Sequence, residues 1–484
     1  MSKDLGKALI NKKKRQISHQ DDIVPQLQSN TQENELDDFL AQATLEGTNF
    51  ESEKLHVKFI STTTVKKKKY NILTSEEEKR LMEQFDELKT KLRLPRRPKW
   101  NNSMTKEQLH QLENEEFLAW RSNLAEIEDT QDLLMTPFEK NLSVWKELWR
   151  VIEKGDLVVQ IVDARNPLLF RCIDLENYVK EVDSRKKNLL LLNKADLLTR
   201  EQRTIWAKYF DGINIDYLFF SAKGSEFDDI LDVEALVDEL FKRCPDPLHP
   251  SEKNPLMKMV SFCGHPNVGK SSTINAIVGT KKVTVSSTPG KTKHFQTLIV
   301  RPDLCLCDCP GLVFPSFATT RAAMVCHGIL PIDNLKDFLS PCAIIVQQIP
   351  PAYLSKIYGI SIPTRPDAED FLSILAKARG FMRSGFGSPD TSRSARIVLK
   401  DYVDGKLTYA YPPPEYTSQF NFYDQTGKTF VKPTLANEVD DDFFTPIESI
   451  KAKTKGTHST DDFTRKQQGV KSTSKKHYKG RKSK

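Results

Sequence analysis

The central part of the chain, between residues 156 and 313, alternates short apolar runs with segments whose apolar positions recur at helical spacing. The runs are nearly continuous instead of alternating with polar residues, which is typical of strands buried on both faces by helices. This pattern predicts an α/β fold with a mostly parallel sheet and helices on both faces. The expected strands fall at residues 157–162, 189–192, 217–220, 257–263, 298–300 and 304–307.

The segments on either side of this α/β core have other patterns. Apolar side chains three and four residues apart, among them Trp120 and Trp145, predict helices before the core, and mixed helical patterning follows it. Both ends are polar and charged, as in segments that stay flexible until they bind a larger surface. We expect a basic, partly flexible extension, a helical lead, the core, a mainly helical domain, and a tail with an acidic patch and a basic arm. Their bounds are 1–104, 105–153, 154–317, 318–412 and 413–484.

Basic residues are concentrated in short runs, although the net charge of the whole chain is only +7. The runs are Lys12–Arg15, Lys66–Lys69, Arg96–Arg97 and the stretch from Arg465 to Lys484, which has no acidic residue. Such arms attract polyanions because binding to phosphates releases condensed counterions, so we expect contacts with RNA. The alternative for any single run is a solvated tail.

Composition also bears on the compartment. The first sixteen residues are too polar for a signal peptide, and no run approaches the roughly 18 apolar residues of a membrane span. We therefore expect no membrane span and reduced cysteines in cytosol or nucleus. Cys305, Cys307 and Cys309 lack the pair spacing of zinc sites and alternate as on one face of a strand, so we interpret them as part of a buried strand.

A phosphate-binding loop follows the fourth expected strand. The sequence from Gly264 to Ser271 is GHPNVGKS, which matches GxxxxGK[ST], and a helical pattern follows it. Glycines at both ends let backbone amides wrap phosphates, and the helix N-terminus adds positive charge. Lys270 is expected to bridge the β- and γ-phosphates. The expected phosphate-binding residues are Gly264, Asn267, Val268, Gly269, Lys270, Ser271 and Ser272.

Features downstream of this loop fit a triphosphate bound with Mg²⁺. Asp308 ends the last expected strand in the sequence DCPG and is expected to hold Mg²⁺ through water, while the amide of Gly311 senses the γ-phosphate. Ser271 and Thr292 are the expected protein ligands of the ion. Lys270, Thr292 and Gly311 are thus the expected catalytic residues. DxxG alone is a common pattern, but it stands here at a strand end about forty residues after the loop lysine.

Two motifs upstream of the loop predict that the base is guanine. The sequence NKAD follows the second expected strand, and the carboxylate of Asp196 can accept from guanine N1–H and the exocyclic amine, which excludes adenine. The sequence SAK follows the third strand, and the Ala222 amide can donate to guanine O6. The expected guanine-binding residues are Asn193, Lys194, Asp196, Ser221, Ala222 and Lys223.

The order of these motifs is not that of an ordinary G domain, in which the phosphate loop comes first and the guanine motifs last. Strands can be reconnected without moving their ends when the original termini lie close together. We therefore predict a circularly permuted P-loop GTPase domain with its site at the carboxyl ends of the strands. The DCPG switch then ends this domain and is tethered directly to the C-terminal domain from residue 314 onward.

These residues resemble a known family, the circularly permuted GTPases of ribosome assembly. The likeness is carried by the permuted order, by DARNP at 163–167 together with NKAD and DCPG, and by longer strings such as GLVFPSF at 311–317. It covers most of the chain and is strongest for the eukaryotic cytoplasmic branch that acts on the large subunit. The resemblance implies a GTPase that uses GTP/GDP and Mg²⁺. It also implies binding to the late pre-60S subunit, through rRNA and ribosomal proteins, and release of the nuclear export adapter in the cytoplasm.

The resemblance leaves the positioning of the attacking water open. Leu312 stands where Ras-like enzymes have the Gln that orients water, so we expect slow intrinsic hydrolysis that the subunit activates. Residues 136–141 lack the His that some bacterial relatives have there. Asn267 matches the position at which some relatives hold K⁺, so we expect K⁺ or rRNA to assist. We interpret His294, near Thr292, as structural, the catalytic role being the alternative.

Two other functions stay open from the sequence. A GTP-binding rRNA scaffold with little hydrolysis is favoured by Leu312 and opposed by the intact set of Lys270, Ser271, Thr292 and Asp308. A nucleolar or nuclear assembly GTPase is the second, with the basic C-terminal arm as a localisation signal. We expect a monomer that is cytoplasmic, with nuclear shuttling.

Overall fold

The computed structural model describes most of the chain between residues 70 and 423. The described ranges are 70, 72–88, 91–101, 103–131, 133–248, 250, 254–279, 296–333, 335–383, 387–414 and 416–423. The expectations for Thr292 and His294, for the acidic patch and for the basic runs at 12–15, 66–69 and 465–484 lie outside the described residues.

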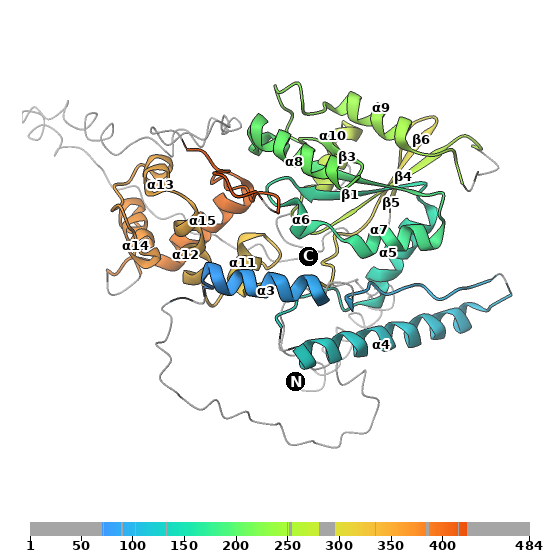
Figure 1. The fold of residues 1–484 in the computed structure, drawn as a ribbon, viewed down its shortest axis with the longest axis horizontal. Helices are drawn as coiled ribbons and strands as arrows, with labels where there is room; N and C mark the ends of the chain where they lie inside the picture. Colours follow the sequence, from blue (N-terminus) through green and yellow to red (C-terminus); the bar gives the residue numbers. More distant parts are fainter. Residues whose placement is uncertain are drawn as a thin grey trace, which may run out of the picture.

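A six-stranded sheet forms the centre of the described structure (Figure 1). Its strands lie in the order β3-β2-β1-β4-β6-β5, all parallel except β5, which pairs antiparallel with β6. The α/β class and each of the expected strands are confirmed. The bounds are β1 Leu157–Asp163, β2 Lys187–Asn193, β3 Tyr217–Phe219, β4 Lys258–Gly264, β5 Gln296–Arg301 and β6 Leu304–Asp308.

Strand β5 lies at one edge of the sheet and has no fully buried residue, whereas β3 at the other edge has two. Ile299 in this strand is 65 % exposed, so the expectation that every apolar run is buried on both faces is wrong here. An edge strand has a neighbour on one side only, and its apolar residues can therefore remain in contact with water. Its neighbour β6 is buried throughout, which confirms the interpretation of Cys305 and Cys307 as strand residues.

Helices cover both faces of the sheet (Figure 1). One face packs against α5 (Leu142–Lys154) and α7 (Ile173–Val182), where Trp149 and Tyr178 join the same buried cluster as Val158 of β1. The helices whose apolar residues join the other large cluster, together with Val159 and Ile161 of β1, are α8 (Arg200–Gly212), α9 (Val233–Arg243) and α10 (Lys270–Val278). Because β1, β2, β3, β4 and β6 are parallel, the loops that follow them all lie at the carboxyl ends of the strands, on one side of this three-layered unit.

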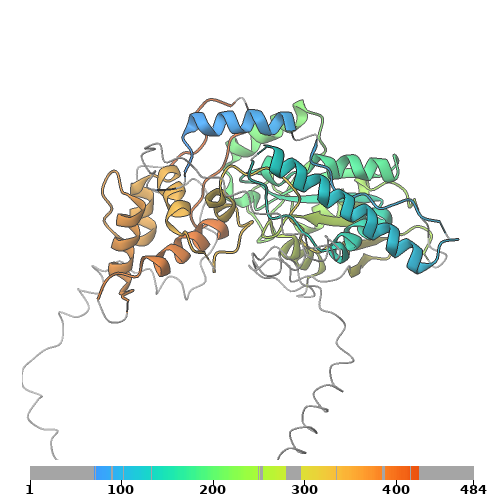
Figure 2. The same ribbon diagram turned by 90° about the horizontal axis from the view of Figure 1, so that it is seen from below.

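In the part of the chain that the structure describes, five helices follow the sheet and lie beside it (Figures 1 and 2). They are α11 (Arg321–Cys326), α12 (Leu339–Gln348), α13 (Pro351–Tyr358), α14 (Ala368–Arg379) and α15 (Thr391–Asp404). Phe371 of α14 and Leu399 of α15 belong to the same buried cluster as the sheet, so the two units share one continuous core. None of the described helices combines the length and the apolar character needed to cross a bilayer.

The described part of the N-terminal region packs against both units. Helix α3 (Ser75–Leu88) lies along the C-terminal helices and the sheet domain in both views (Figures 1 and 2). Tyr70 donates to the carboxylate of Asp367, while Phe85 stacks on Phe317 with ring centroids 5.3 Å apart. Helix α4 (Lys106–Gln131) follows. The segment from residue 70 to the end of α4 therefore links the switch end of the sheet domain to the C-terminal helices.

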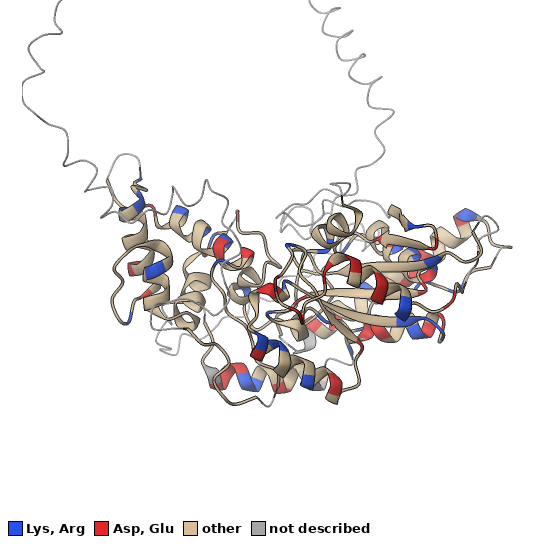
Figure 3. Cartoon of the chain, turned by 90° about the horizontal axis from the view of Figure 1, so that it is seen from above, with Lys and Arg blue, Asp and Glu red and all other residues tan. Residues whose placement is uncertain are grey.

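Arg96 and Arg97 do not belong to a free basic arm, because both are paired with carboxylates, while their contact with RNA stays a prediction. Arg96 pairs with Asp174 at 2.6 Å and with Glu181 at 2.7 Å, while Arg97 pairs with Glu113 at 3.0 Å. Lys and Arg positions alternate with Asp and Glu positions along many of the helices of the cartoon in Figure 3. The carboxylates come from helices far away in the sequence, so the charge run alone could not show that they neutralise it.

Candidate guanine-nucleotide site

The predicted motifs meet at the carboxyl edge of the sheet. NKAD follows β2, SAK follows β3, the phosphate loop follows β4 and DCPG begins at the end of β6. The chain moves outward from β1 to β3 and then returns to β4, on the other side of β1, so the topological switch point lies between β1 and β4. Open α/β sheets bind ligands in the crevice outside such a point.

Backbone geometry explains both glycines of the phosphate loop. Gly264 and Gly269 have φ of +155° and +93°, a region that residues with a Cβ rarely adopt. A Cβ on Gly264 would lie 2.5 Å from the carbonyl oxygen of Ile161, and one on Gly269 would lie 2.2 Å from Asn193 Nδ2. Either substitution would therefore push the loop away from the strands that position it.

Asn193 connects the phosphate half of the site to the guanine half. Its Nδ2 donates to the carbonyl oxygen of Val268 at 2.8 Å, and its Oδ1 accepts from the backbone amide of Ala222 at 3.3 Å. The first residue of NKAD thus holds the phosphate loop and the SAK loop together. Val268 and Asn193 are both buried, so these bonds form away from competing water.

The carboxylate of Asp196 is oriented by the SAK loop. Ser221 Oγ donates to Asp196 Oδ1 at 2.6 Å and accepts from the amide of Lys223 at 3.3 Å. Asp196 is 7 % exposed, and the hydrogen bond from Ser221 fixes its rotamer. A fixed carboxylate at this position can accept from two neighbouring donors on a purine edge, as the guanine prediction requires.

Lys270 and Asp308 meet below the phosphate loop. Lys270 begins α10 and forms a short ion pair with Asp308 Oδ1, while Asp308 Oδ2 has no hydrogen-bond partner among the described residues. Burial raises the pKa of Asp308, and the Lys270 charge opposes that rise. Ser271, the next residue of α10, is half-buried. A buried carboxylate oxygen without a partner among the described residues matches the all-oxygen coordination that Mg²⁺ prefers, and Ser271 offers a hydroxyl as a second ligand.

Leu312 lies in the core instead of lining the site. It is 1 % exposed and belongs to a buried cluster with Cys309 and Phe314, and its amide donates to the carbonyl oxygen of Gly264 at 3.3 Å. The Cα of Gly311 passes near Pro266 of the phosphate loop, whose backbone would lie 3.6 Å from a Cβ on this glycine. The backbone of DCPG therefore adjoins the phosphate loop. The side chain of Leu312, which replaces the usual Gln, is buried in the apolar core.

Residues 134–139 run alongside the segment that follows DCPG. The amide of Thr136 donates to the carbonyl oxygen of Ser316 at 2.8 Å, and the Thr136 hydroxyl donates to that of Phe314 at the same distance. The amide of Glu139 donates to the carbonyl oxygen of Val313 at 3.2 Å. Residues 136–139, which lack the His of some bacterial relatives, thus hold the segment after DCPG through hydrogen bonds to its backbone.

Two P-loop side chains make contacts that the sequence did not suggest. Asn267, at φ +63°, donates through Nδ2 to the carbonyl oxygen of Gly328 at 2.7 Å, which ties the phosphate loop to the C-terminal domain. His265 is buried between the rings of Phe170 and Phe314, and burial lowers its pKa to about 4. No periodicity or spacing marks either contact, because the partners are remote in the chain.

Asp163 and Arg165, noted in the sequence only for their family likeness, belong to the guanine half of the site. Asp163 ends β1 directly opposite Asn193, and its Oδ2 lies 2.9 Å from Lys194 Nζ and 2.7 Å from Arg165 Nη2. Burial would raise the pKa of Asp163, but the charges of Arg165 and Lys194 hold it well below its usual range. The useful sequence signal was a carboxylate at a strand end beside the NKAD strand.

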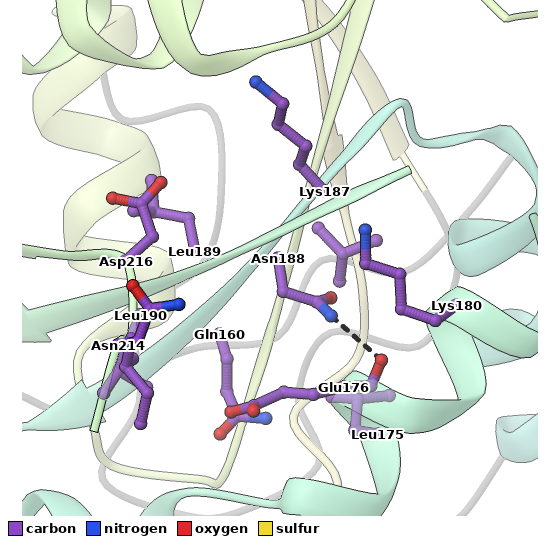
Figure 4. A pocket seen from close by; sticks show the side chains of 12 residues that line it. Gln160, Leu175, Glu176, Lys180, Lys187, Asn188, Leu189, Leu190, Asn214 and Asp216 are labelled. Atoms are coloured by element: carbon purple, nitrogen blue, oxygen red, sulfur yellow. Dashed lines mark hydrogen bonds between the residues drawn. The ribbon is translucent and has the colours of Figure 1, made fainter. Parts of the chain in front are cut away.

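A separate cavity of about 460 Å³ lies at the opposite edge of the sheet (Figure 4). Its lining comes from the early residues of β1 and β2, from α7 and from the turn before β3. Several polar groups there are already bonded, as when Asn188 Nδ2 donates to the carbonyl oxygen of Glu176 at 2.9 Å. Because these residues lie at the amino-terminal ends of the strands, the cavity is distinct from the nucleotide site at their carboxyl ends.

Comparisons with known proteins bear on this site. A family model described as "50S ribosome-binding GTPase" matches residues 259–339. The chain is 45 % identical over 439 residues to "Large subunit GTPase 1" of Saccharomyces cerevisiae, covering 80 % of this chain and 69 % of that protein. It is 40 % identical over 507 residues to the Homo sapiens homologue, covering 80 % and 76 %. A solved structure of GDP-bound YlqF aligns with 99 % of its length and 56 % of this chain, at 21 % identity and a TM-score of 0.39.

The sheet order and the motifs at its carboxyl edge define a P-loop GTPase whose G domain is circularly permuted. Sequence identity over more than two thirds of the relatives makes the assignment more specific. The chain belongs to the Large subunit GTPase 1 family, and it is a GTPase.

Proposed function

We propose that this GTPase acts as a nucleotide-dependent switch on the late pre-60S ribosomal subunit. In this role it drives release of the nuclear export adapter during maturation in the cytoplasm. The names of the relatives and of the matched family support the subunit as its partner. The observation that carries the proposal is that one phosphate loop bonds both the backbone directly after DCPG, through Gly264, and the C-terminal domain, through Asn267.

Each part of the site has a proposed task in hydrolysis. Lys270 and the amides of the loop hold the β- and γ-phosphates, and Asp196 with the SAK loop reads guanine. Ser271 and Asp308, with Thr292 from the segment outside the described residues, hold Mg²⁺, which neutralises charge that develops on the phosphates. Asn267 offers its amide oxygen to K⁺, because its nitrogen is already bonded to Gly328.

Slow hydrolysis without the subunit follows from the position of Leu312. A buried leucine can neither donate to nor accept from water, so the orienting group has to come from elsewhere. We propose that rRNA of the bound subunit or K⁺ supplies it. The basic arms outside the described residues are the proposed contacts with rRNA.

Single-turnover hydrolysis of GTP on purified large subunits tests the proposal. We expect the wild-type chain to be accelerated strongly by subunits and Lys270→Ala to hydrolyse at the background rate while still binding them. Equal rates for the two proteins would instead support a GTP-binding rRNA scaffold. Acceleration only by early nuclear particles would support the nuclear assembly step, and imaging of the tagged chain would show where it acts.

A further inference from the structure

Arg165 joins the guanine motif to the last helix of the C-terminal domain. Its Nη1 donates to the carbonyl oxygen of Tyr402 at 2.7 Å, and its Nη2 donates to that of Val403 at 2.9 Å. These are among the last carbonyls of α15, where the helix dipole favours a cation, and the Tyr402 carbonyl also accepts from the amide of Gly405 at 3.3 Å. The same guanidinium is held by Asp163, which also holds Lys194.

A second Asp-x-Arg turn in the chain shows what the local sequence accounts for. Asp183 and Arg185 repeat the geometry, with Arg185 Nη2 donating to Asp183 Oδ2 at 2.7 Å and the Arg185 amide donating to Oδ1 at 2.9 Å. That pair is on the surface, where the Arg185 side chain is 64 % exposed. The Asp–Arg contact is therefore a property of the turn. The lysine of NKAD and the helix carbonyls are what distinguish the pair at 163 and 165.

Further contacts join the end of α15 and the segment after it to Leu197 and Arg165, next to the guanine motif. Gly405 caps α15 at φ +90°, and a Cβ there would lie 2.5 Å from Leu197 Cδ1, one residue after NKAD. The amide of Tyr411 donates to the carbonyl oxygen of Arg165 at 2.8 Å. The turn after NKAD and the end of α15 thus share a tight interface.

A purely structural ion cluster would have these contacts as well, but it would not include a base-reading residue. Lys194 adopts a left-handed backbone conformation at φ +60°, and its ammonium is fixed by a carboxylate that is 5 % exposed. Buried charges rearrange together because a lone one is costly. A displacement of Lys194 would therefore reach Arg165 and the α15 carbonyls.

We propose that Asp163 and Arg165 are positioning residues that fix Lys194 for the guanine base and make the seating of α15 depend on occupancy of the guanine site. GDP and GTP share this base, so both nucleotides seat α15 equally. The route is separate from the switch at Gly311, which senses the γ-phosphate. This inference rests on the guanine-binding role proposed for NKAD.

The first test compares nucleotide affinities of the full-length chain by equilibrium fluorescence with labelled GDP and a labelled non-hydrolysable GTP analogue. Arg165→Lys keeps the charge but cannot bond Asp163 and two carbonyls at once. We expect it to weaken both nucleotides by the same factor, about tenfold. Arg185→Lys is the matched control and should change neither affinity more than about twofold. A loss confined to the triphosphate, or none, would overturn the proposal.

The second test needs no variant. Hydrogen exchange at the amide of Tyr411, which bonds Arg165, is measured in wild-type protein without nucleotide, with GDP and with the GTP analogue. We expect both nucleotides to slow exchange to the same extent, about tenfold. Protection by the triphosphate alone, or by neither, contradicts the inference. If Asp196→Asn leaves GDP binding unchanged, the proposed guanine site itself fails, whatever α15 does.

Discussion

Lys270 of the phosphate loop and Asp308 at the end of β6 form a buried ion pair, and only one oxygen of the aspartate has a partner among the described residues. One carboxylate therefore adjoins the phosphate lysine and still has an oxygen to offer a metal ion. The pair connects the start of α10 to the end of β6, and the loops beside both are expected to face the γ-phosphate. Its energetics are open to measurement.

Replacing Lys270 by Ala should destabilise the nucleotide-free protein by about 3 kcal/mol at neutral pH, because a buried carboxylate loses its partner. Burial already raises the pKa of Asp308, so its stability contribution is present at low pH and is lost as pH rises through the folded pKa. Without the Lys270 charge the folded pKa of Asp308 rises further, so the loss of stability continues to higher pH. Urea unfolding in EDTA between pH 4 and pH 8 should show a difference between variant and wild type that grows with pH.

The control for this experiment is Lys242→Ala, which removes a cation from an exposed pair with Glu239. Water screens exposed pairs, so little change in stability is expected. A pH-independent loss in Lys270→Ala equal to that of the control would show that the buried pair is not a strong interaction.

Asp196→Asn should change the base that the enzyme binds. An amide in place of the carboxylate presents a donor to the purine edge, which suits the second carbonyl of xanthine and leaves the guanine amine poorly matched. We expect GTP affinity to fall at least about 100-fold, with xanthosine triphosphate binding better than GTP. Competition binding measures both. Ser221→Ala, which removes only the hydroxyl that orients Asp196, should weaken GTP without this exchange of preference.

Leu312→Gln should not restore fast hydrolysis. The side chain is 1 % exposed within an apolar cluster, so a glutamine there would bury an amide without partners and cost about 2 kcal/mol or more. Thermal unfolding and single-turnover rates measure the two effects. Leu312→Met, of similar volume, should be nearly neutral. A Leu312→Gln protein that is stable and hydrolyses GTP rapidly alone would show that the leucine is what limits the rate.

Stimulation by K⁺ should depend on the amide oxygen of Asn267. Asn267→Gly keeps the positive φ without strain but removes the oxygen, so rates in K⁺ and Na⁺ at equal ionic strength should become equal. Asn267→Asp keeps an oxygen but loses the bond to Gly328, so it should retain the preference for K⁺. If the glycine variant still prefers K⁺, another residue holds the ion.

Arg97→Ala should affect stability and leave RNA affinity unchanged. Arg97 pairs with Glu113, whose side chain is only 5 % exposed, and the loss should cost about 2 kcal/mol. Thermal unfolding measures this loss, and filter binding to large-subunit rRNA measures the affinity. Lys99→Ala, an exposed position nearby, should change neither quantity measurably. A drop in RNA affinity with Arg97→Ala, without any loss of stability, would instead show that this pair contacts RNA.

The strands and the nucleotide motifs could be predicted because each depends on neighbouring residues. A continuous apolar run predicts a buried central strand. A GxxxxGK[ST] loop between a strand and a helix predicts a phosphate-binding site. The same reasoning was wrong for Ile299, because an apolar run does not say whether its strand lies at an edge. It also could not show that Arg96 and Arg97 are paired with carboxylates, because these partners lie 78 and 16 residues away.

The sequence alone thus determined the class of fold, the order of the motifs and the base that they read, since these follow from spacing and side-chain chemistry within short segments. Only the tertiary structure decided that Arg165 reaches α15, that Asn267 bonds Gly328 and that Leu312 is buried. These contacts join segments that are remote in the chain, and their partners are ordinary carbonyls and apolar side chains. Such groups carry no pattern of their own, so only packing in three dimensions selects them.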